Sequence, residues 1–297
     1  MEIAVIGSIN MDYNNKVKSL PKKGETIVSQ SFKMAGGGKG ANQAITAKRL
    51  GKEVYMIGAL GEDIAGDILF QELKAEGIDV DGIQRVKEPT GNAFITIDDM
   101  GDNTIVAYLG ANAYVNREII DRKKSVLERC QIIVIQLEIP LETVYYICSI
   151  GYDMGIPIIL DPAPAASLSK DIYTSIHTIT PNETELRSLT GEDDIERGAE
   201  KLLSLGVKEV IVTLGERGCY YTDGSLSTYI DAFTVDAIDT TAAGDSFNGA
   251  YAVALVEGQS KIDALKFANA VGSLTTTKLG AYDALPLRDD VEKFLKR

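Results

Sequence analysis

The sequence predicts an α/β fold: a three-layer, doubly wound and mostly parallel sheet with a small β-sheet lid. Short apolar strands alternate with amphipathic helices along most of the 297 residues, the pattern of βαβ units. The run 131–137 is almost continuously apolar, as expected of a parallel strand covered on both faces. Two regions, at about 12–34 and 91–110, break the alternation with extended segments. They predict a lid formed by insertions, so residues 1–297 are expected to form a single domain.

The elements follow from the period of the apolar residues. Strands are expected at 2–7, 53–58, 131–137, 156–161, 176–180 and 208–213. Helices are expected at 39–50, 64–76, 117–128, 141–154, 193–205, 245–257, 261–277 and 287–296. In the lid, extended segments are expected at 12–18 and 24–34, and a hairpin joins 91–98 to 104–109.

Composition restricts the possible partners. The formal net charge of −13 argues against nucleic acids and anionic membranes, since both require basic patches. No apolar run approaches the length of a membrane span, and the start of the chain has no basic flank or cleavage site. Cys130, Cys148 and Cys219 lack the spacing of a metal site, so buried thiols in a cytoplasmic protein are expected.

The single histidine, His177, nearly excludes histidine-based triads and multi-histidine zinc sites. Proton transfer must then rely on a carboxylate, lysine, tyrosine or cysteine.

The segment Asp239-Thr-Thr-Ala-Ala-Gly-Asp245 carries the most chemical information. Small residues lead into an apolar helical pattern, so backbone N–H groups and the helix dipole would form an anion site there. A carboxylate beside an anion site is explained if Asp245 is a general base and the anion is a transferring phosphoryl group. Taken alone, the segment is equally compatible with a tight turn and a stabilising acid in the first helical turn.

A second glycine cluster, Gly36-Gly-Gly-Lys39-Gly-Ala-Asn42, opens the helix expected at 39–50. It follows the lid and not the first strand, which argues against a dinucleotide-binding dehydrogenase. It also lacks the first glycine and the Ser/Thr of a P-loop, because Lys33 and Gly40 occupy those positions. Backbone amides next to an ammonium group suit a polyhydroxylated ligand.

Further polar groups follow predicted strands, where ligands of open α/β sheets bind. Asn10 and Asp12 follow the first strand, and Glu138 follows the strand at 131–137. An Asp with a neighbouring Asn suits sugar recognition, although an Asx turn is the alternative at each strand end. Asn182-Glu-Thr-Glu185 has the form of a capping box, and Thr213-Leu-Gly-Glu-Arg-Gly218 offers amides at the same edge.

The chain resembles the ribokinase-like carbohydrate kinases over essentially its whole length. The motifs that carry the resemblance are Gly37-Gly-Lys-Gly-Ala-Asn-Gln43, Gln136-Leu-Glu138, Asp161-Pro-Ala-Pro164, Thr180-Pro-Asn-Glu-Thr-Glu185 and Asp239-Thr-Thr-Ala-Ala-Gly-Asp245. The family has a main α/β domain and a β lid, and the lids of two subunits often pack together. The resemblance therefore implies a homodimer through the lid.

The resemblance also implies roles for individual residues. The sugar would be bound by Asn10, Met11, Asp12, Gly38, Lys39, Gly40, Ala41, Asn42 and Glu138. Asp245 would be the catalytic base, and the amides of Ala242, Ala243, Gly244 and Asp245 would hold the phosphoryl charge. ATP, with Mg²⁺ or another divalent cation, would contact Asn182, Glu185, Thr213, Leu214, Gly215, Glu216, Arg217, Gly218, Gly244, Asp245 and Asn269. An activating K⁺ would be held by Asp239, Thr241, Thr275, Lys278, Gly280 and Ala284.

One position departs from the family pattern. Members of the family usually have Gly-Ala-Gln where this chain has Gly280-Ala281-Tyr282-Asp283, so the cation site or the adenine pocket is expected to differ here.

The expected reaction is transfer of the ATP γ-phosphoryl group to the 5-hydroxyl of D-ribose, giving ribose 5-phosphate. Asn10 offers a partner for a 2-hydroxyl, which favours ribose. The alternatives are a kinase of deoxyribose, of another furanose or of a nucleoside. A non-catalytic sugar or nucleotide sensor is a further alternative, but a sensor has no need of a base such as Asp245.

Overall fold

The computed structural model describes residues 2–296, in which nine strands form the main sheet. Their order across the sheet is β13-β12-β11-β10-β9-β8-β1-β4-β5, and every pair is parallel except β11–β12 and β12–β13. The strands are β1 (Ile3–Ile6), β4 (Val54–Gly61), β5 (Asp79–Val86), β8 (Ile132–Ile135), β9 (Ile158–Leu160), β10 (Thr178–Ile179), β11 (Glu209–Thr213), β12 (Cys219–Thr222) and β13 (Ser227–Ile230).

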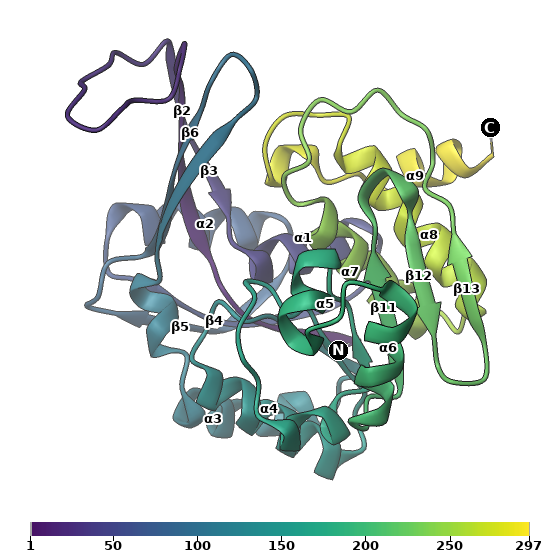
Figure 1. Ribbon diagram of the computed structural model, residues 1–297. Helices are drawn as coiled ribbons and strands as arrows, with labels where there is room; N and C mark the ends of the chain where they lie inside the picture. Colours follow the sequence, from purple (N-terminus) through teal and green to yellow (C-terminus); the bar gives the residue numbers. More distant parts are fainter. Residues whose placement is uncertain (1, 297) are drawn as a thin grey trace.

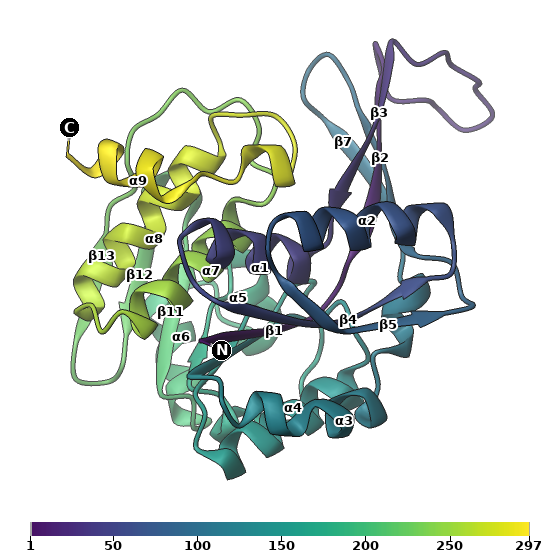
Figure 2. The same ribbon diagram turned by 180° about the vertical axis from the view of Figure 1, so that it is seen from behind.

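Helices cover both faces of this sheet (Figures 1 and 2). In β1, Ile3 and Val5 pack into one apolar core while Ala4 and Ile6 pack into the other, because successive side chains of a strand point to opposite faces. The first core is shared with α1 (Lys39–Arg49), α2 (Ile64–Ala75), α7 (Ala243–Val256), α8 (Lys261–Thr275) and α9 (Arg288–Leu295). The second is shared with α3 (Arg117–Leu127), α4 (Leu141–Met154), α5 (Glu183–Thr190) and α6 (Ile195–Ser204).

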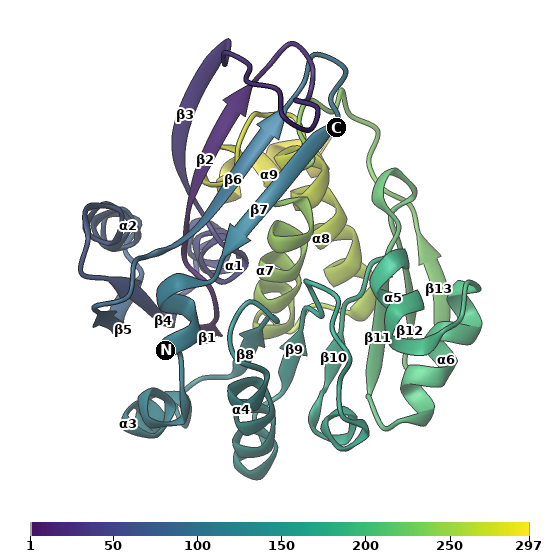
Figure 3. The ribbon, with the colours of Figure 1, turned by 60° about the vertical axis from the view of Figure 1, so that its left-hand side comes forward.

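A separate four-stranded sheet stands out from the body as the lid (Figure 3). Its strands, in spatial order, are β3 (Ser31–Gly37), β2 (Asn10–Lys16), β6 (Gly91–Ile97) and β7 (Asn103–Tyr108). Pairing aligns Met34, Tyr13, Phe94 and Val106 in one cross-strand row, so these apolar side chains share a face. Asp12 belongs to the opposite face, since side chains alternate along β2.

Short 3₁₀ helices complete the path of the chain. They are η1 (Gly110–Tyr114), η2 (Lys170–Ser175), η3 (Gly215–Arg217) and η4 (Tyr282–Ala284). Among residues 2–296, no helix is long and apolar enough to cross a membrane.

The predicted fold class is confirmed, with local differences. The periodicity did not reveal β5, β12, β13 or the eight-residue helix α5. In the segment expected to be extended at 24–34, a strand forms only from Ser31. The helix expected at 245–257 begins two residues earlier, at Ala243, so Asp245 lies inside its first turn.

Candidate active site

The predicted polar residues gather at the carboxyl edge of the parallel strands. Glu138 and Asp161 follow β8 and β9, while Asn182 and Thr213 form an isolated bridge at the ends of β10 and β11. Helices α1 and α7 both begin at this edge, and β2 starts there at Asn10 and continues into the lid. The fold therefore places the residues predicted to bind a sugar, and the turn before α7 that is predicted to bind an anion, beside the lid (Figure 3).

Helices α1 and α7 pack closely enough to join their polar side chains. The Asn42 side-chain amide donates to Asp245 Oδ2 at 2.7 Å. One reason for the close approach is Gly249, where an added Cβ would lie 2.8 Å from Gln43 O and 2.9 Å from Thr46 Cβ. The orientation of Asp245, which is 6% exposed, is thus fixed by the packing of two core helices.

The turn before α7 has an unusual backbone. Ala242 adopts a left-handed conformation, with φ 61° and ψ 7°, which is costly for a residue with a Cβ and is often found at functional sites. The N–H of Ala243 donates to Thr240 O at 3.2 Å. Within residues 2–296 the N–H groups of Gly244 and Asp245 have no acceptor, as expected in the first turn of a helix. Two backbone donors are therefore free for an anion beside the Asp245 carboxylate.

The residues predicted to bind the sugar lie between β2, α1 and β8. Glu138 Oε2 accepts hydrogen bonds from the Ser8 hydroxyl at 2.5 Å and from the Lys39 backbone N–H at 3.3 Å. Asp12 lies directly over Gly37, where a Cβ would be 2.2 Å from Asp12 Oδ2. Gly38 has φ 91°, a conformation that favours glycine. The glycine cluster thus provides room for the Asp12 carboxylate and turns the chain into α1.

Among the other predicted sugar residues, Gly40 packs against the end of β1, since a Cβ would lie 2.7 Å from the carbonyl carbon of Gly7. The side chains of Met11 and Ala41 are buried in the core beneath the site.

The site holds an excess of negative charge. Burial, together with Glu138 and Asp245, raises the pKa of Asp12 to about 7. Burial also raises the pKa of Asp161. Burial disfavours the ammonium of Lys39, yet Asp245, Asp161 and Glu138 outweigh this and raise its pKa. Lys39 therefore stays charged and partly balances the carboxylates around it.

Sequence reasoning assigned no role to several residues that orient the site. Asn112, in η1, donates its side-chain amide to Asn10 Oδ1 at 2.7 Å and accepts from the Ile9 backbone N–H at 2.9 Å. The Gln43 amide donates to Asp161 Oδ2 at 2.8 Å, and Gln136 donates to Gln43 Oε1 at 2.5 Å. Gln43, Gln136 and Asp161 occur in the motifs that carry the family resemblance, whereas nothing in the sequence marks Asn112.

The predicted nucleotide residues line β10, β11 and the elements beside them. Asn182 and Glu185 form the predicted capping box, in which Glu185 Oε2 accepts the Asn182 N–H at 2.8 Å and Asn182 Oδ1 accepts the Glu185 N–H at 2.9 Å. The loop after β11 closes through Leu214 N–H to Gly218 O at 2.8 Å. Glu216 and Arg217 are exposed, and Arg217 pairs with Glu183 at 2.7 Å.

Asn269 lies in α8, and its side-chain amide donates to the carbonyls of Ile230 and Asp231 at 3.1 and 3.2 Å. It therefore fixes the chain that leaves β13.

The residues predicted to hold a monovalent cation come from the segment before α7 and from the stretch between the end of α8 and η4, and Asp239 joins these two segments. Asp239 Oδ1 accepts the Thr241 N–H at 2.9 Å, and Oδ2 accepts the Gly280 N–H at 2.8 Å. The buried Thr275 hydroxyl lies 2.8 Å from Ser246 Oγ in α7. Lys278 is exposed, whereas Ala284 is buried. Within residues 2–296, no three His, Cys, Asp or Glu side chains are grouped so that they could hold a metal ion.

Comparison with known proteins identifies the family of the chain. The model of the pfkB family of carbohydrate kinases matches residues 1–288. The chain is 40% identical to a ribokinase of Bacillus subtilis over 294 residues, covering 99% of both chains. It is also 36% identical to a deoxyribokinase of Salmonella typhi over 302 residues, again covering 99% of both.

Solved structures show the same fold. A ribokinase from Thermotoga maritima, 40% identical, superposes with a TM-score of 0.94 and covers 100% of this chain and 99% of that one. Ribokinase of Arabidopsis thaliana in complex with ribose and ATP, 34% identical, gives a TM-score of 0.93 with the same coverage. This chain therefore belongs to the pfkB family of carbohydrate kinases and is an ATP-dependent carbohydrate kinase.

Proposed function

We propose that the enzyme transfers the γ-phosphoryl group of ATP to the 5-hydroxyl of D-ribose. Asp245 takes the proton of the hydroxyl as the sugar oxygen bonds to the γ-phosphorus. The bond from that phosphorus to the β,γ-bridging oxygen breaks, and ADP leaves with the bond's electron pair. The products are ribose 5-phosphate, ADP and the proton first held by Asp245.

One observation carries this proposal: a buried carboxylate stands beside two unpaired backbone donors. The N–H groups of Gly244 and Asp245 have no acceptor among residues 2–296, so they are available to oxygens that gain charge in the transition state. Asn42 holds the carboxylate at 2.7 Å and leaves its other oxygen, Asp245 Oδ1, with only a 3.5 Å contact to Gln43. That oxygen is the proposed proton acceptor.

Asn10 supports ribose over 2-deoxyribose. The side-chain oxygen of Asn10 accepts a hydrogen bond from Asn112. The NH₂ group of Asn10 is therefore left as a donor for the sugar. A site built to hydrogen-bond a hydroxyl discriminates against a sugar that lacks it, because a polar group is then left unpaired. The relatives include both ribokinases and deoxyribokinases, so deoxyribose is the second candidate.

The nucleotide site suits Mg²⁺ that arrives with ATP. Mg²⁺ usually takes one or two carboxylates together with substrate phosphates, which agrees with the absence of a three-residue metal cluster among residues 2–296. Glu185 is buried at this edge and would hold the ion through water. Bound Mg²⁺ would neutralise phosphate charge that the acidic site otherwise repels. A putative ribokinase II of E. coli, 25% identical, has been solved with ATP and Mg²⁺.

We also propose K⁺ as an activator. Asp239 places a carboxylate between the loops of Thr241 and Gly280, and oxygen donors of this kind suit a hard cation. A comparison of rates in KCl and in choline chloride of equal ionic strength tests this, and equal rates would exclude activation.

The lid face that carries the apolar row of Met34, Tyr13, Phe94 and Val106 suits a homodimer through the lid. On that face Met34, Phe94 and Val106 are 45%, 52% and 69% exposed, and such a patch marks an interaction surface. A second copy of the chain is the proposed occupant. Analytical ultracentrifugation should show a dimer for the natural chain and a monomer for Phe94→Glu. Ile105→Glu, on the other face of the lid, should remain dimeric.

The test of the main proposal is phosphorylation of a panel of sugars by the purified enzyme. Ribose, 2-deoxyribose, other furanoses and nucleosides are compared by kcat/KM with ADP release as the signal. Ribose should be the best substrate, and Asn10→Ala should reduce its advantage over deoxyribose. If another member of the panel exceeds ribose, the assignment of ribose is wrong.

A further inference from the structure

We propose that Tyr282 is a positioning residue for the sugar, tying the end of lid strand β3 to the C-terminal segment through the Gly37 carbonyl. This inference rests on the proposed sugar kinase function and concerns how the sugar loop is held.

The contact itself is direct. The Tyr282 hydroxyl donates to Gly37 O at 3.0 Å, across 245 positions of sequence. The ring fills the space beside Gly36, where an added Cβ would lie 2.2 Å from a ring carbon. Tyr282 is 8% exposed, so this hydrogen bond is sheltered from water and from competition by it.

The tyrosine is itself anchored to the body of the protein. Arg49, at the end of α1, donates to the carbonyls of Tyr282 and Leu285 at 2.6 and 2.8 Å. The same guanidinium forms a two-pronged pair with Glu76, at 2.5 and 3.0 Å. Asp239 holds Gly280, two residues before Tyr282. Tyr282 is therefore the fixed partner, and the strand that ends at Gly37 is the element it restrains.

A second, weaker tie joins the same two segments. Lys33 in β3 pairs with Asp283 at 2.8 Å, and their side chains are 58% and 70% exposed. Exposed pairs contribute little and are screened by salt. Tyr282 and Asp283 of η4 thus both contact β3. Tyr282 does so through a buried hydrogen bond and Asp283 through an exposed ion pair.

The restrained segment lies under the sugar-binding carboxylate. Gly37 pairs with Asn10 in the β2–β3 register, and its lack of a Cβ leaves room for the Asp12 carboxylate two residues along β2. Loss of the Tyr282 hydrogen bond would free the Gly37 carbonyl and loosen the loop that leads from β3 to Lys39. The effect should fall on the sugar, because the proposed nucleotide residues Asn182 and Thr213 lie at the ends of β10 and β11, away from this contact.

The experiment is the substitution Tyr282→Phe, which removes the hydroxyl and keeps the ring. We expect the KM for ribose and its dissociation constant, measured by calorimetry without ATP, to rise about three- to tenfold, the size of one hydrogen bond. The KM for ATP and kcat should stay within about twofold. Tyr55→Phe is the matched control, because Tyr55 is also buried and its hydroxyl has no partner among residues 2–296. This control should leave all three constants unchanged.

Asp283→Asn sharpens the test. It should raise the ribose KM less than Tyr282→Phe does, and 1 M salt should remove the difference from the natural enzyme. A natural enzyme that does not phosphorylate ribose would refute the proposed function, and the same variants would then be compared on the sugar that it does accept. If Tyr282→Phe lowers thermal stability but changes sugar and ATP constants equally, or not at all, the positioning role is wrong.

Discussion

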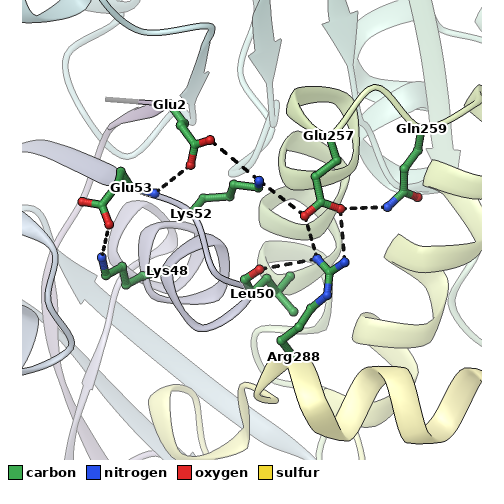
Figure 4. A network of polar contacts seen from close by, with 8 residues as sticks. All are labelled: Glu2, Lys48, Leu50, Lys52, Glu53, Glu257, Gln259 and Arg288. Atoms are coloured by element: carbon green, nitrogen blue, oxygen red, sulfur yellow. Dashed lines mark hydrogen bonds and ion pairs between the residues drawn. The ribbon is translucent and has the colours of Figure 1, made fainter.

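Two charged regions lie at opposite ends of the α1–α7 helix pair. One has an excess of carboxylates, and in the other each charge has a partner of opposite sign. At the carboxyl edge of the sheet, Lys39 is the cation among Asp245, Asp161, Glu138 and Glu185, and Glu138 and Asp245 also act on Asp12. At the other end, Figure 4 shows a network of Lys48, Lys52 and Arg288 with Glu2, Glu53 and Glu257, and Arg288 pairs in addition with Glu292 at 2.9 Å.

The network is arranged so that each charge has a partner. Arg288 donates to both carboxylate oxygens of Glu257, at 2.9 and 3.3 Å, and Lys52 lies 3.4 Å from the same residue. Burial opposes the charge of Glu257, but the hydrogen bonds from Arg288 and Gln259 hold its pKa below the usual range. In the site, by contrast, burial and neighbouring carboxylates raise the pKa of Asp12 to about 7.

The difference separates structural charge from functional charge. A balanced network ties α1, α7 and α9 together, whereas an unbalanced one keeps carboxylates available for hydroxyl groups and for a proton. Ligand sites commonly sacrifice stability in this way.

The largest effect should come from Asp245. Asp245→Asn keeps the shape of the side chain but cannot take the proton, so we expect kcat to fall by roughly 10²–10⁴. Steady-state ADP release measures the loss, and circular dichroism checks that the fold is kept. Undiminished turnover would rule out Asp245 as the base.

The next effect is on the pH dependence of sugar capture. The raised pKa of Asp12 means that its carboxylate is largely protonated below about pH 7 and then accepts hydroxyl hydrogen bonds poorly. We expect kcat/KM for ribose to fall by about tenfold per pH unit below that value. In Asp12→Asn, kcat/KM for ribose should be low at every pH and should no longer fall below about pH 7. If the fall persists in this variant, it belongs to another group.

The same residue should affect stability in the opposite direction. Because the folded pKa of Asp12 is raised, its protonated form favours folding, and that contribution is lost as pH rises from about 4 through 7. Asp12→Asn mimics the neutral form. Its Tm should therefore exceed that of the natural enzyme at pH 8 and approach it at pH 4 to 5. A lower Tm at pH 8 would show that Asp12 is not under electrostatic strain.

The smallest effect should come from the balanced network. Glu257→Gln removes the carboxylate shared by Arg288 and Lys52, whose side chains are partly exposed, so a loss of about 1 kcal/mol is expected. Calorimetry should show a Tm lower by about 2 °C, with ribose kinetics unchanged. The difference should shrink in 1 M salt, and a change in kcat would mean that the two regions are coupled.

Much of the site was predictable because its residues follow strands or open helices. Parallel strands bring their carboxyl ends to one edge, so the apolar periodicity that predicts the strands also predicts that Asn10, Glu138, Asn182 and Thr213 lie at that edge. The hairpin of β12 and β13 was not predicted, although Asp223-Gly224 between the two strands is a turn signal.

Other features arise from contacts that no local pattern encodes. Asn112 meets Asn10 across 102 positions, and Tyr282 meets Gly37 across 245. The left-handed conformation of Ala242 has no sequence signal, because alanine ordinarily favours helix. These details depend on how the lid and the C-terminal segment pack, which follows from the whole fold.

The bare Cα at Gly249 has a consequence for how this enzyme changes under selection. A methyl group there would push α1 from α7 well inside the core and carry Asn42 away from Asp245 at the helix tips. The catalytic rate therefore depends on the distance between α1 and α7 in the core as well as on the reacting groups. Laboratory evolution of this kinase should accordingly yield rate variants at interior positions that never touch a sugar.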